Sequence, residues 1–149
     1  MFETILIPTD GSEPAQHAAV KGIELAAEQG ATVHAMYAVE PIPLGGISAG
    51  PEPASAEFGS VIEEQKAEGE KALKAVRQEA NEHGVDVVEA IEYGDPDEEI
   101  LEYAEKEDVD AIVMGTHGRS GAGRLVIGSV AEKVVRKSPI PVLTIRMAE

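Results

Sequence analysis

Five short apolar segments alternate with longer segments of helical pattern, and this alternation limits the possible folds more than any other feature of the sequence. The expected strands cover residues 3–8, 31–39, 85–92, 110–114 and 140–145. The expected helices are one that ends near Gln29, a long one over about 58–83, a short one that begins at Asp95 and one over about 129–137. Strands that alternate with helices are typical of a doubly wound α/β domain with a mainly parallel sheet. We therefore expect a five-stranded sheet in the order 3-2-1-4-5 with helices on both faces.

Local signals mark the ends of several helices. The first helix has Ser12 or Asp10 as its expected cap, Pro14 in its first turn and Gly30 as its stop. The segments Asp95-Pro96-Asp97-Glu98 and Ser129-Val130-Ala131-Glu132 match capping boxes. The residues expected to pack on the sheet are Ala15, Ala19, Ile23 and Ala26 in the first helix, and Val61, Leu73, Val76 and Ala80 in the long helix.

The 149 residues are expected to form a single domain, 1–149. Residues 40–56 are rich in Pro, Gly, Ala and Ser, and this composition suits either a mobile lid over a site or an insertion without a role. The absence of cysteine excludes disulfides, thiolate metal sites and a cysteine nucleophile. The N-terminus has no basic region, and no apolar run is long enough to span a membrane, which predicts a cytoplasmic protein.

The chain is strongly acidic. It contains 28 Asp and Glu against 12 Lys and Arg, and its formal net charge is −16 at pH 7. This charge argues against nucleic acid as a partner, because nucleic-acid binding requires a basic face. The acidity either keeps the protein soluble or reflects adaptation to a salt-rich cytoplasm, in which salt screens the self-repulsion.

A glycine-rich loop follows the fourth expected strand. The stretch Met114-Gly115-Thr116-His117-Gly118 ends this strand, and Gly128-Ser129 opens the last helix. Glycines let backbone N–H groups approach an anion, and a helix N-terminus favours negative charge, so this loop suits a nucleotide phosphate chain. The same spacing also fits an alternative, an ordinary strand-to-helix connection whose glycines only form turns. In the expected sheet the strand order reverses between strands one and four, which brings Pro8-Thr9-Asp10 to the same crevice.

The loop lies in a positively charged part of the sequence. Residues 115–149 contain six basic and two acidic residues, so the remaining residues carry a charge of −20. A positive segment around a glycine loop suits a polyanionic ligand. Arg119 and Arg124 lie in the loop itself and are the better ligand candidates. Three further basic residues lie in the last expected helix, namely Lys133, Arg136 and Lys137. They also have a structural explanation, because cations near a helix C-terminus complement its dipole.

Together these motifs resemble the universal stress protein family over essentially the whole chain. Nucleotide-binding members of the family carry the pattern G-x2-G-x9-G-[ST], which is matched without departure by Gly115, Gly118, Gly128 and Ser129. The opening Ile7-Pro8-Thr9-Asp10-Gly11-Ser12 is similar to the family's first strand and acidic turn. The passage from Lys137 to Leu143 is similar to the family's closing helix and strand. The resemblance implies an ATP-binding regulatory protein.

The resemblance also implies roles for single residues. The adenine and ribose side of an ATP site would be lined by Pro8, Thr9 and Asp10, with Ala38 in the base pocket and Met114 beneath the nucleoside. The ribose and phosphates would lie near Gly115 and Gly118, and the phosphates would bind at Gly128, Ser129 and the N–H group of Val130. Mg or Mn would be held mainly through the phosphates. Family members commonly dimerise through the last strand, which implies a homodimer through Ile140–Ile145.

Several alternatives stay open at this point. Asp10 and Ser129 each suit a helix cap as well as a ligand. The histidines show no metal-ligand spacing, and His117 alone lies in the loop; the others are His17, His34 and His83. Besides a regulator that signals to an unknown protein partner, the motifs allow a slow ATPase or phosphotransferase, with Asp10 orienting water, or a nucleotide-free dimeric scaffold.

Overall fold

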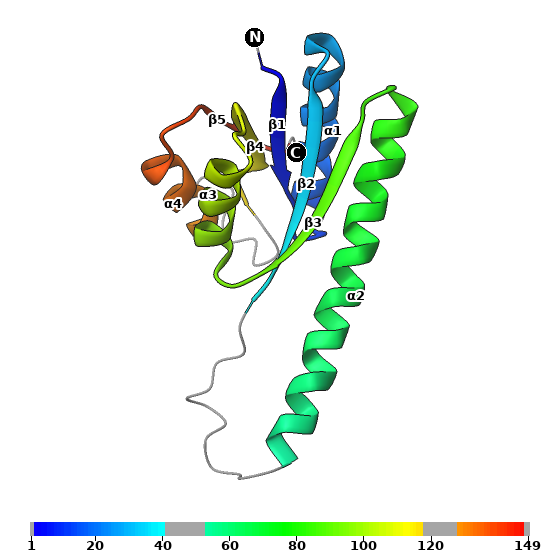
Figure 1. Cartoon of the computed structure of the whole chain (residues 1–149), viewed down its shortest axis with the longest axis vertical. Coiled ribbons are helices and arrows are strands. Elements are labelled where there is room, and N and C mark those ends of the chain that lie inside the picture. Colours follow the sequence, from blue (N-terminus) through cyan, green and yellow to red (C-terminus); the bar gives the residue numbers. More distant parts are fainter. Residues whose placement is uncertain (1, 41–52, 118–127, 148–149) are drawn as a thin grey trace.

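A computed structural model describes residues 2–40, 53–117 and 128–147 (Figure 1). The strands are β1 Thr4–Pro8, β2 Thr32–Val39, β3 Val87–Tyr93, β4 Ala111–Gly115 and β5 Val142–Ile145. The helices are α1 Glu13–Gln29, α2 Pro53–Glu82, α3 Pro96–Lys106 and α4 Ser129–Lys137. Most of the Pro- and Gly-rich segment 40–56 lies outside the described residues, so neither interpretation of it is tested.

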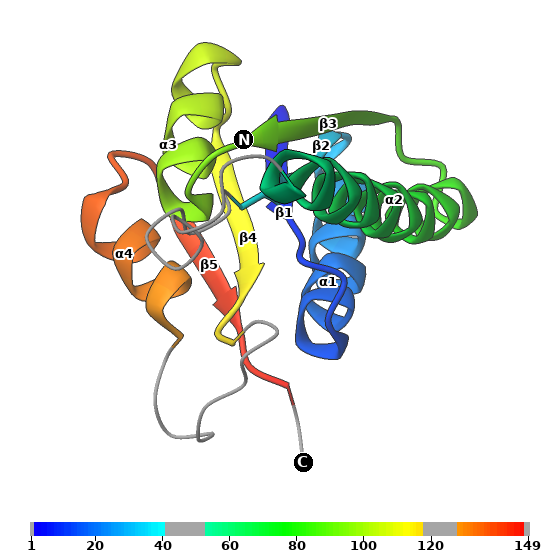
Figure 2. The same cartoon turned by 90° about the horizontal axis from the view of Figure 1, so that it is seen from below.

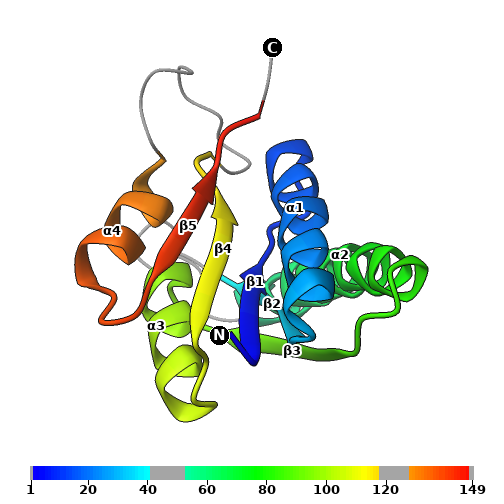
Figure 3. The same cartoon turned by 90° about the horizontal axis from the view of Figure 1, so that it is seen from above.

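The five strands form one sheet in the order β3-β2-β1-β4-β5, and every neighbouring pair is parallel. This confirms the predicted order, and the described sheet is entirely rather than mainly parallel. α1 and α2 cover one face, whereas α3 and α4 cover the other (Figures 2 and 3). The chain runs from β1 outward to β3 and then returns to the other side of β1, so the strand order reverses between β1 and β4.

Both faces of the sheet are buried, and this explains the apolar runs in the sequence. Ile5 and Ile7 of β1 belong to the core beneath α1 and α2, whereas Leu6 between them belongs to the core beneath α3 and α4. All three side chains are fully buried. A strand covered on both sides must be apolar at every position, which is typical of parallel sheets. The predicted apolar face of α1 is buried as expected at Ala15, Ala19, Ile23 and Ala26.

Local signals determine both ends of α1. The Ser12 hydroxyl accepts a hydrogen bond from the Ala15 N–H at 3.3 Å, so Ser12 rather than Asp10 is the N-cap. At the other end Gly30 has φ of +69° and its N–H donates to the Ala26 carbonyl. A residue with a side chain is strained in this left-handed conformation, which is why the helix stops at a glycine.

α2 departs from its prediction at the N-terminal end. It begins at Pro53 rather than near Phe58, and Figure 1 shows its first half extending beyond the sheet. Leu73, Val76 and Ala80 are buried as predicted, but Val61 is 42% exposed. The assignment of Val61 to the core was therefore wrong. Helical periodicity identifies the face that packs, but it does not report where the sheet beneath that face ends.

The two predicted capping boxes do not form. Gly128 occupies the N-cap position of α4, so Ser129 is the first helical residue and does not cap the helix. Asp95 occupies the N-cap position of α3 and Pro96 follows it, but the Asp95 side chain accepts no capping hydrogen bond. The pattern S-x-x-E fits equally well one residue inside a helix, and the backbone contacts of Gly128 determine where α4 starts.

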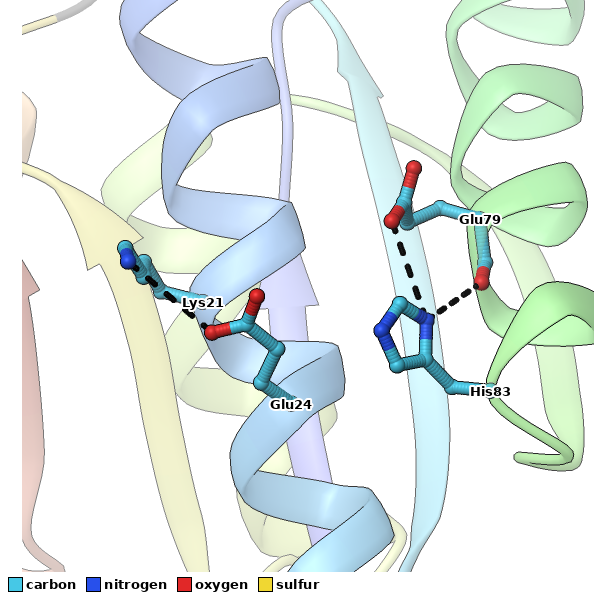
Figure 4. A network of polar contacts seen from close by, with 4 residues as sticks. All are labelled: Lys21, Glu24, Glu79 and His83. Carbon is cyan, nitrogen blue, oxygen red and sulfur yellow. Dashed lines mark hydrogen bonds and ion pairs between the residues drawn. The ribbon is translucent and has the colours of Figure 1, made fainter.

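α1 and α2 lie side by side on their face of the sheet (Figure 4). In α1, Lys21 Nζ lies 3.9 Å from Glu24 Oε1, and His83 Nδ1, just after α2, lies 3.7 Å from Glu79 Oε2. Both pairs are partly exposed and join residues one helical turn apart, so they contribute little to stability and do not link the two helices. The helices are held by apolar packing on the sheet. In the described part of the chain, no helix combines the length and the apolar character needed to cross a bilayer.

Candidate functional site

The candidate site lies at the carboxyl edge of the sheet, between β1 and β4. β1 pairs with β2 on one side and with β4 on the other, and both pairs are parallel. The chain therefore leaves β1 at Pro8-Thr9-Asp10 and leaves β4 at Gly115-Thr116 along the same edge. Ligands of open α/β sheets bind at such a reversal of strand order. The ends of β1 and β4 therefore lie at one edge of the sheet, as predicted, while residues 118–127 of the glycine loop lie outside the described residues.

The turn between β1 and α1 is held by a backbone hydrogen bond to β2 and by two of its own side chains. The Thr9 N–H donates to the Met36 carbonyl at 2.9 Å, and the buried Thr9 hydroxyl accepts from the Gly11 N–H at 3.1 Å. Asp10 Oδ1 accepts from the Ser12 N–H at 3.0 Å. Gly11 has φ of +80°, which favours glycine. The carboxylate of Asp10 thus shapes the turn that leads into α1, while Ser12 caps the helix.

Gly115 lets β4 approach the first turn of α1 at backbone distance. A Cβ atom at this position would lie 3.1 Å from the Pro14 carbonyl oxygen and 3.2 Å from the His117 carbonyl oxygen. Neither neighbour can give way easily, because both are backbone atoms. The sequence pattern assigns this glycine to a ligand, and the structure adds a packing reason for it: Gly115 lets the end of β4 lie against the start of α1.

The N-terminus of α4 is anchored beside the end of β4. The Thr116 N–H donates to the Ile145 carbonyl at 3.1 Å, and the Gly128 N–H donates to the Thr116 carbonyl at 2.6 Å. These bonds link β5, the end of β4 and the start of α4. Because Gly128 is the N-cap and has no side chain, no side-chain cap occupies the first turn of α4. Uncapped N–H groups at a helix N-terminus attract anions.

The described basic residues of the positive segment lie mainly away from this N-terminus. Arg136 and Lys137 are in the last turn of α4, and Arg136 Nε lies 3.3 Å from Glu132 Oε2. The structural explanation, that these cations complement the helix dipole, fits their position. Lys133 is exposed in the middle of the helix. Arg119 and Arg124, the loop candidates, lie outside the described residues.

The remaining predicted site residues are placed by the strands. Ala38 is the last but one residue of β2 and is partly buried, and Met114 is buried in β4 in the core beneath α3 and α4. Ser129 is exposed and Val130 is partly buried at the start of α4. Gly118 lies outside the described residues. The sequence did not identify the roles of Met36 and Thr116, because both act through their backbone carbonyl groups.

The histidines do not form a ligand set. His34 Nδ1 lies 2.7 Å from the Tyr103 hydroxyl, between β2 and α3, and His83 Nδ1 lies 3.0 Å from the Glu79 carbonyl. His117 Nδ1 lies 3.1 Å from the Thr116 hydroxyl at the edge of the candidate site. Among the described residues, no group of three or more His, Cys, Asp or Glu side chains is arranged to hold a metal ion.

His34 predicts a pH dependence of stability. Burial lowers the pKa of His34, and the Glu107 carboxylate opposes this shift. As the pH falls, His34 in the unfolded chain takes up a proton near the ordinary imidazole pKa of about 6.5. At that pH His34 in the folded protein is still neutral. The free energy of unfolding should therefore fall as the pH drops below about 6.5, and this decrease should end below the folded pKa. We expect His34→Gln to remove that part of the pH dependence, measured by urea unfolding from about pH 8 to pH 5.

Tyr103→Phe is the matched control for this prediction. It removes the hydroxyl that lies against His34 but leaves the imidazole able to titrate, so the pH dependence should persist. Unfolding free energies of wild type and His34→Gln that stay parallel across this pH range would contradict the assignment to His34.

Known sequences match nearly the whole chain. Residues 1–146 match the universal stress protein family. The universal stress protein MJ0531 of Methanocaldococcus jannaschii is 40% identical over 146 residues, which cover 98% of this chain and 83% of the relative. The universal stress protein YxiE of Bacillus subtilis is 34% identical over 151 residues, which cover 98% of this chain and 100% of the relative.

Solved structures share the fold. The structure of MJ0577, a protein of Methanocaldococcus jannaschii, matches with a TM-score of 0.84 at 28% identity, over 100% of this chain and 99% of that chain. A universal stress protein in complex with cAMP has a TM-score of 0.67 at 23% identity, over 99% of this chain and 98% of its own. The universal stress protein of Archaeoglobus fulgidus in complex with dAMP has a TM-score of 0.60 at 22% identity, over 97% of each chain.

Proposed function

Because the chain belongs to the universal stress protein family, we propose that it is an ATP-binding regulatory protein that acts as a homodimer in the cytoplasm. Its nucleotide state signals to a protein partner in a stress response. The observation that carries this proposal is the meeting of the β1 turn, the end of β4 and the N-terminus of α4 at one edge of the sheet. Parallel α/β sheets bind their ligands at this position.

The chemical groups at this edge suit a phosphate chain better than a metal ion. The start of α4 offers backbone N–H groups without a side-chain cap. The nearby carboxylate, Asp10, is already bonded to the Ser12 N–H. Divalent cations such as Mg need oxygen ligands, and here the phosphates of ATP supply most of them. We therefore propose that Mg or Mn enters the site with the nucleotide and is held mainly through its phosphates.

The proposed position of the nucleotide follows the edge of the sheet. Adenine and ribose lie along the end of β1, at Pro8, Thr9 and Asp10, with Ala38 in the base pocket and Met114 beneath the nucleoside. Ribose and phosphates pass Gly115, Gly118 and Arg119, and the phosphates bind Gly128, Ser129 and the Val130 N–H. The related structures that contain cAMP and dAMP support nucleotide binding within this fold.

Calorimetric titration of the purified protein with Mg-ATP tests this proposal. We expect saturable binding near one ATP per subunit. The titration is run at low and at high salt, because a net charge of −16 repels ATP and salt screens this repulsion. A folded protein that binds no ATP at either salt concentration would contradict the nucleotide site and would favour the nucleotide-free scaffold.

The edge strand β5 supports the proposed homodimer. β5 ends the described sheet on the side of β4, so its outer edge has no strand neighbour among the described residues. Leu143 is in register with Val113, which places it on the α1 side of the sheet, and it is 48% exposed. An exposed edge with an apolar side chain is a site for pairing with another chain. A second β5 across a two-fold axis would cover both the edge and Leu143.

Leu143→Arg is expected to convert the dimer to monomers. Two arginines would face each other at the symmetric interface, and the dissociation constant should rise at least about a hundredfold. Sedimentation equilibrium measures this change. Val61→Arg is the matched control, because Val61 is about as exposed but lies on α2, away from β5. If Leu143→Arg remains dimeric, the proposed interface is wrong.

A further inference from the structure

The outer strand β3 has an open face. Val87 and Ile91 pack into the core beneath α1 and α2, so Val88 and Ala90 point to the opposite face. On that face α3 packs mainly on α4 and β2 and covers β3 only in part: Ala90 packs against the core beneath α3 and α4, whereas Val88 does not. Val88 is consequently 44% exposed, although it lies within a strand. We refer to the exposed Val88 and the partly buried Ala90 beside it as the open β3 face.

Carboxylates lie along α3 and at the end of β3, where Glu92 is on the same face of the strand as Val88 and Ala90. We call them the acidic rim, and they are Glu92 of β3, Asp95 in the following turn, Glu98, Glu99 and Glu102 of α3, and Glu107 at its end. Burial raises the pKa of Glu99, and the carboxylates of Glu102, Glu92, Glu98 and Asp95 raise it further. Burial also raises the pKa of Tyr103 to about 12, with contributions from Glu107 and Glu92. Glu92 contributes to both shifts, so carboxylates of β3 and α3 lie close enough to interact with one another.

The acidic rim is not neutralised within the described part of the chain. The ion pairs there use other acidic residues, namely Glu24, Glu79, Glu89 and Glu132. Lys106 is the basic residue in the last turn of α3, and it forms no ion pair with the rim among the described residues. Carboxylates gathered without cations repel one another, and a positively charged occupant relieves this repulsion.

We propose that the open β3 face and its acidic rim bind a basic, partly apolar segment of a partner protein. An apolar side chain of that segment covers Val88, and its Lys or Arg side chains meet the rim carboxylates. His34 of β2 is in register with Val88, and its ring is hydrogen-bonded to the Tyr103 hydroxyl. The hydrogen-bonded pair of His34 and Tyr103 therefore lies next to the apolar contact. The local charge of the rim selects this occupant over a second copy of the rim itself, because the rim carboxylates attract cationic side chains and repel an equally acidic surface.

A synthetic peptide of alternating Lys and Val is the probe, and fluorescence anisotropy measures its binding to the full chain. We expect saturable binding that Val88→Ser weakens about threefold or more. Replacing Glu92, Glu99 and Glu102 together by Gln should weaken it about tenfold. The matched control replaces Glu63, Glu64 and Glu70, which are exposed on α2, by Gln and removes the same charge elsewhere. This control should bind nearly as well as wild type.

Three results would overturn the proposal. Equal losses in the rim variant and the α2 control would mean that the peptide responds only to net charge. Equally tight binding of a Lys and Ser peptide would remove the role of Val88. Self-association of the wild type that Val88→Ser abolishes would assign this surface to a second copy. Circular dichroism checks that each variant is folded. If Val88→Ser does not fold, the comparison of the rim variant with the α2 control tests the proposal.

Discussion

Ser129→Asp is expected to weaken ATP binding about a hundredfold while the protein stays folded. Ser129 is the first residue of α4 and is exposed, so an aspartate there interacts favourably with the helix dipole. The same charge would face the proposed phosphates. At about 4 Å and an effective dielectric constant of about 20, two like charges repel by about 4 kcal/mol, which exceeds the energy of a hundredfold loss. Calorimetric titration with Mg-ATP measures the binding, and thermal unfolding measures the stability.

The control for this variant is Gln78→Glu. Gln78 is exposed on α2, and the substitution adds the same charge far from the proposed site. If both variants lose affinity equally, the effect comes from the net charge of the protein. If Ser129→Asp binds ATP as tightly as wild type, the phosphates do not lie at the N-terminus of α4. Because the proposed contact is local, high salt should restore only part of the lost affinity.

The order of elements was predictable because each signal is local in the sequence. Strands buried on both faces appear as continuous apolar runs, and Ser12 and Gly30 mark the ends of α1 through their own chemistry. Contacts between distant segments have no such signal. Asp110 Oδ2 accepts hydrogen bonds from the N–H groups of Glu3 and Thr4 at 2.8 and 2.9 Å, and so ties the start of β1 to the start of β4. Nothing near Asp110 in the sequence predicts this role.

The candidate site was predictable in outline but not in its contacts. The sequence identified the end of β1 and the glycine pattern because both are short motifs. The contacts that hold the site together join backbone atoms, such as the Thr9 N–H to the Met36 carbonyl and the Gly128 N–H to the Thr116 carbonyl. Every residue type offers a carbonyl group, so residue identity does not reveal which one is used. The capping assignment of Ser129 was wrong for this reason, since the Gly128 contact sets the start of α4.

Gly22→Val is expected to lower the free energy of unfolding by about 3 kcal/mol. Gly22 lies on the face of α1 that packs against β1 and β4. A Cβ atom there would lie 2.7 Å from Ile7 Cδ1 and 3.2 Å from Val113 Cγ1. Both side chains are fully buried, so they have little space to move. The added carbon atoms would push α1 away from the sheet, and with it the Thr9–Ser12 turn at the candidate site. Urea unfolding measures the change.

A double-mutant cycle with Ile7→Ala tests the contact itself. Ile7→Ala alone should cost about 3–4 kcal/mol, because it leaves a cavity in the core. In the double variant the valine at position 22 fills that space, so the combined loss should be smaller than the sum by about 2 kcal/mol. Ala27→Val, at an exposed position of α1, controls for the lower helix propensity of valine and should add to Ile7→Ala without coupling. Additive losses in the Gly22→Val and Ile7→Ala pair would contradict the packing described for α1. The double variant should also bind ATP more tightly than Gly22→Val alone, because the position of α1 determines the position of the turn that follows β1.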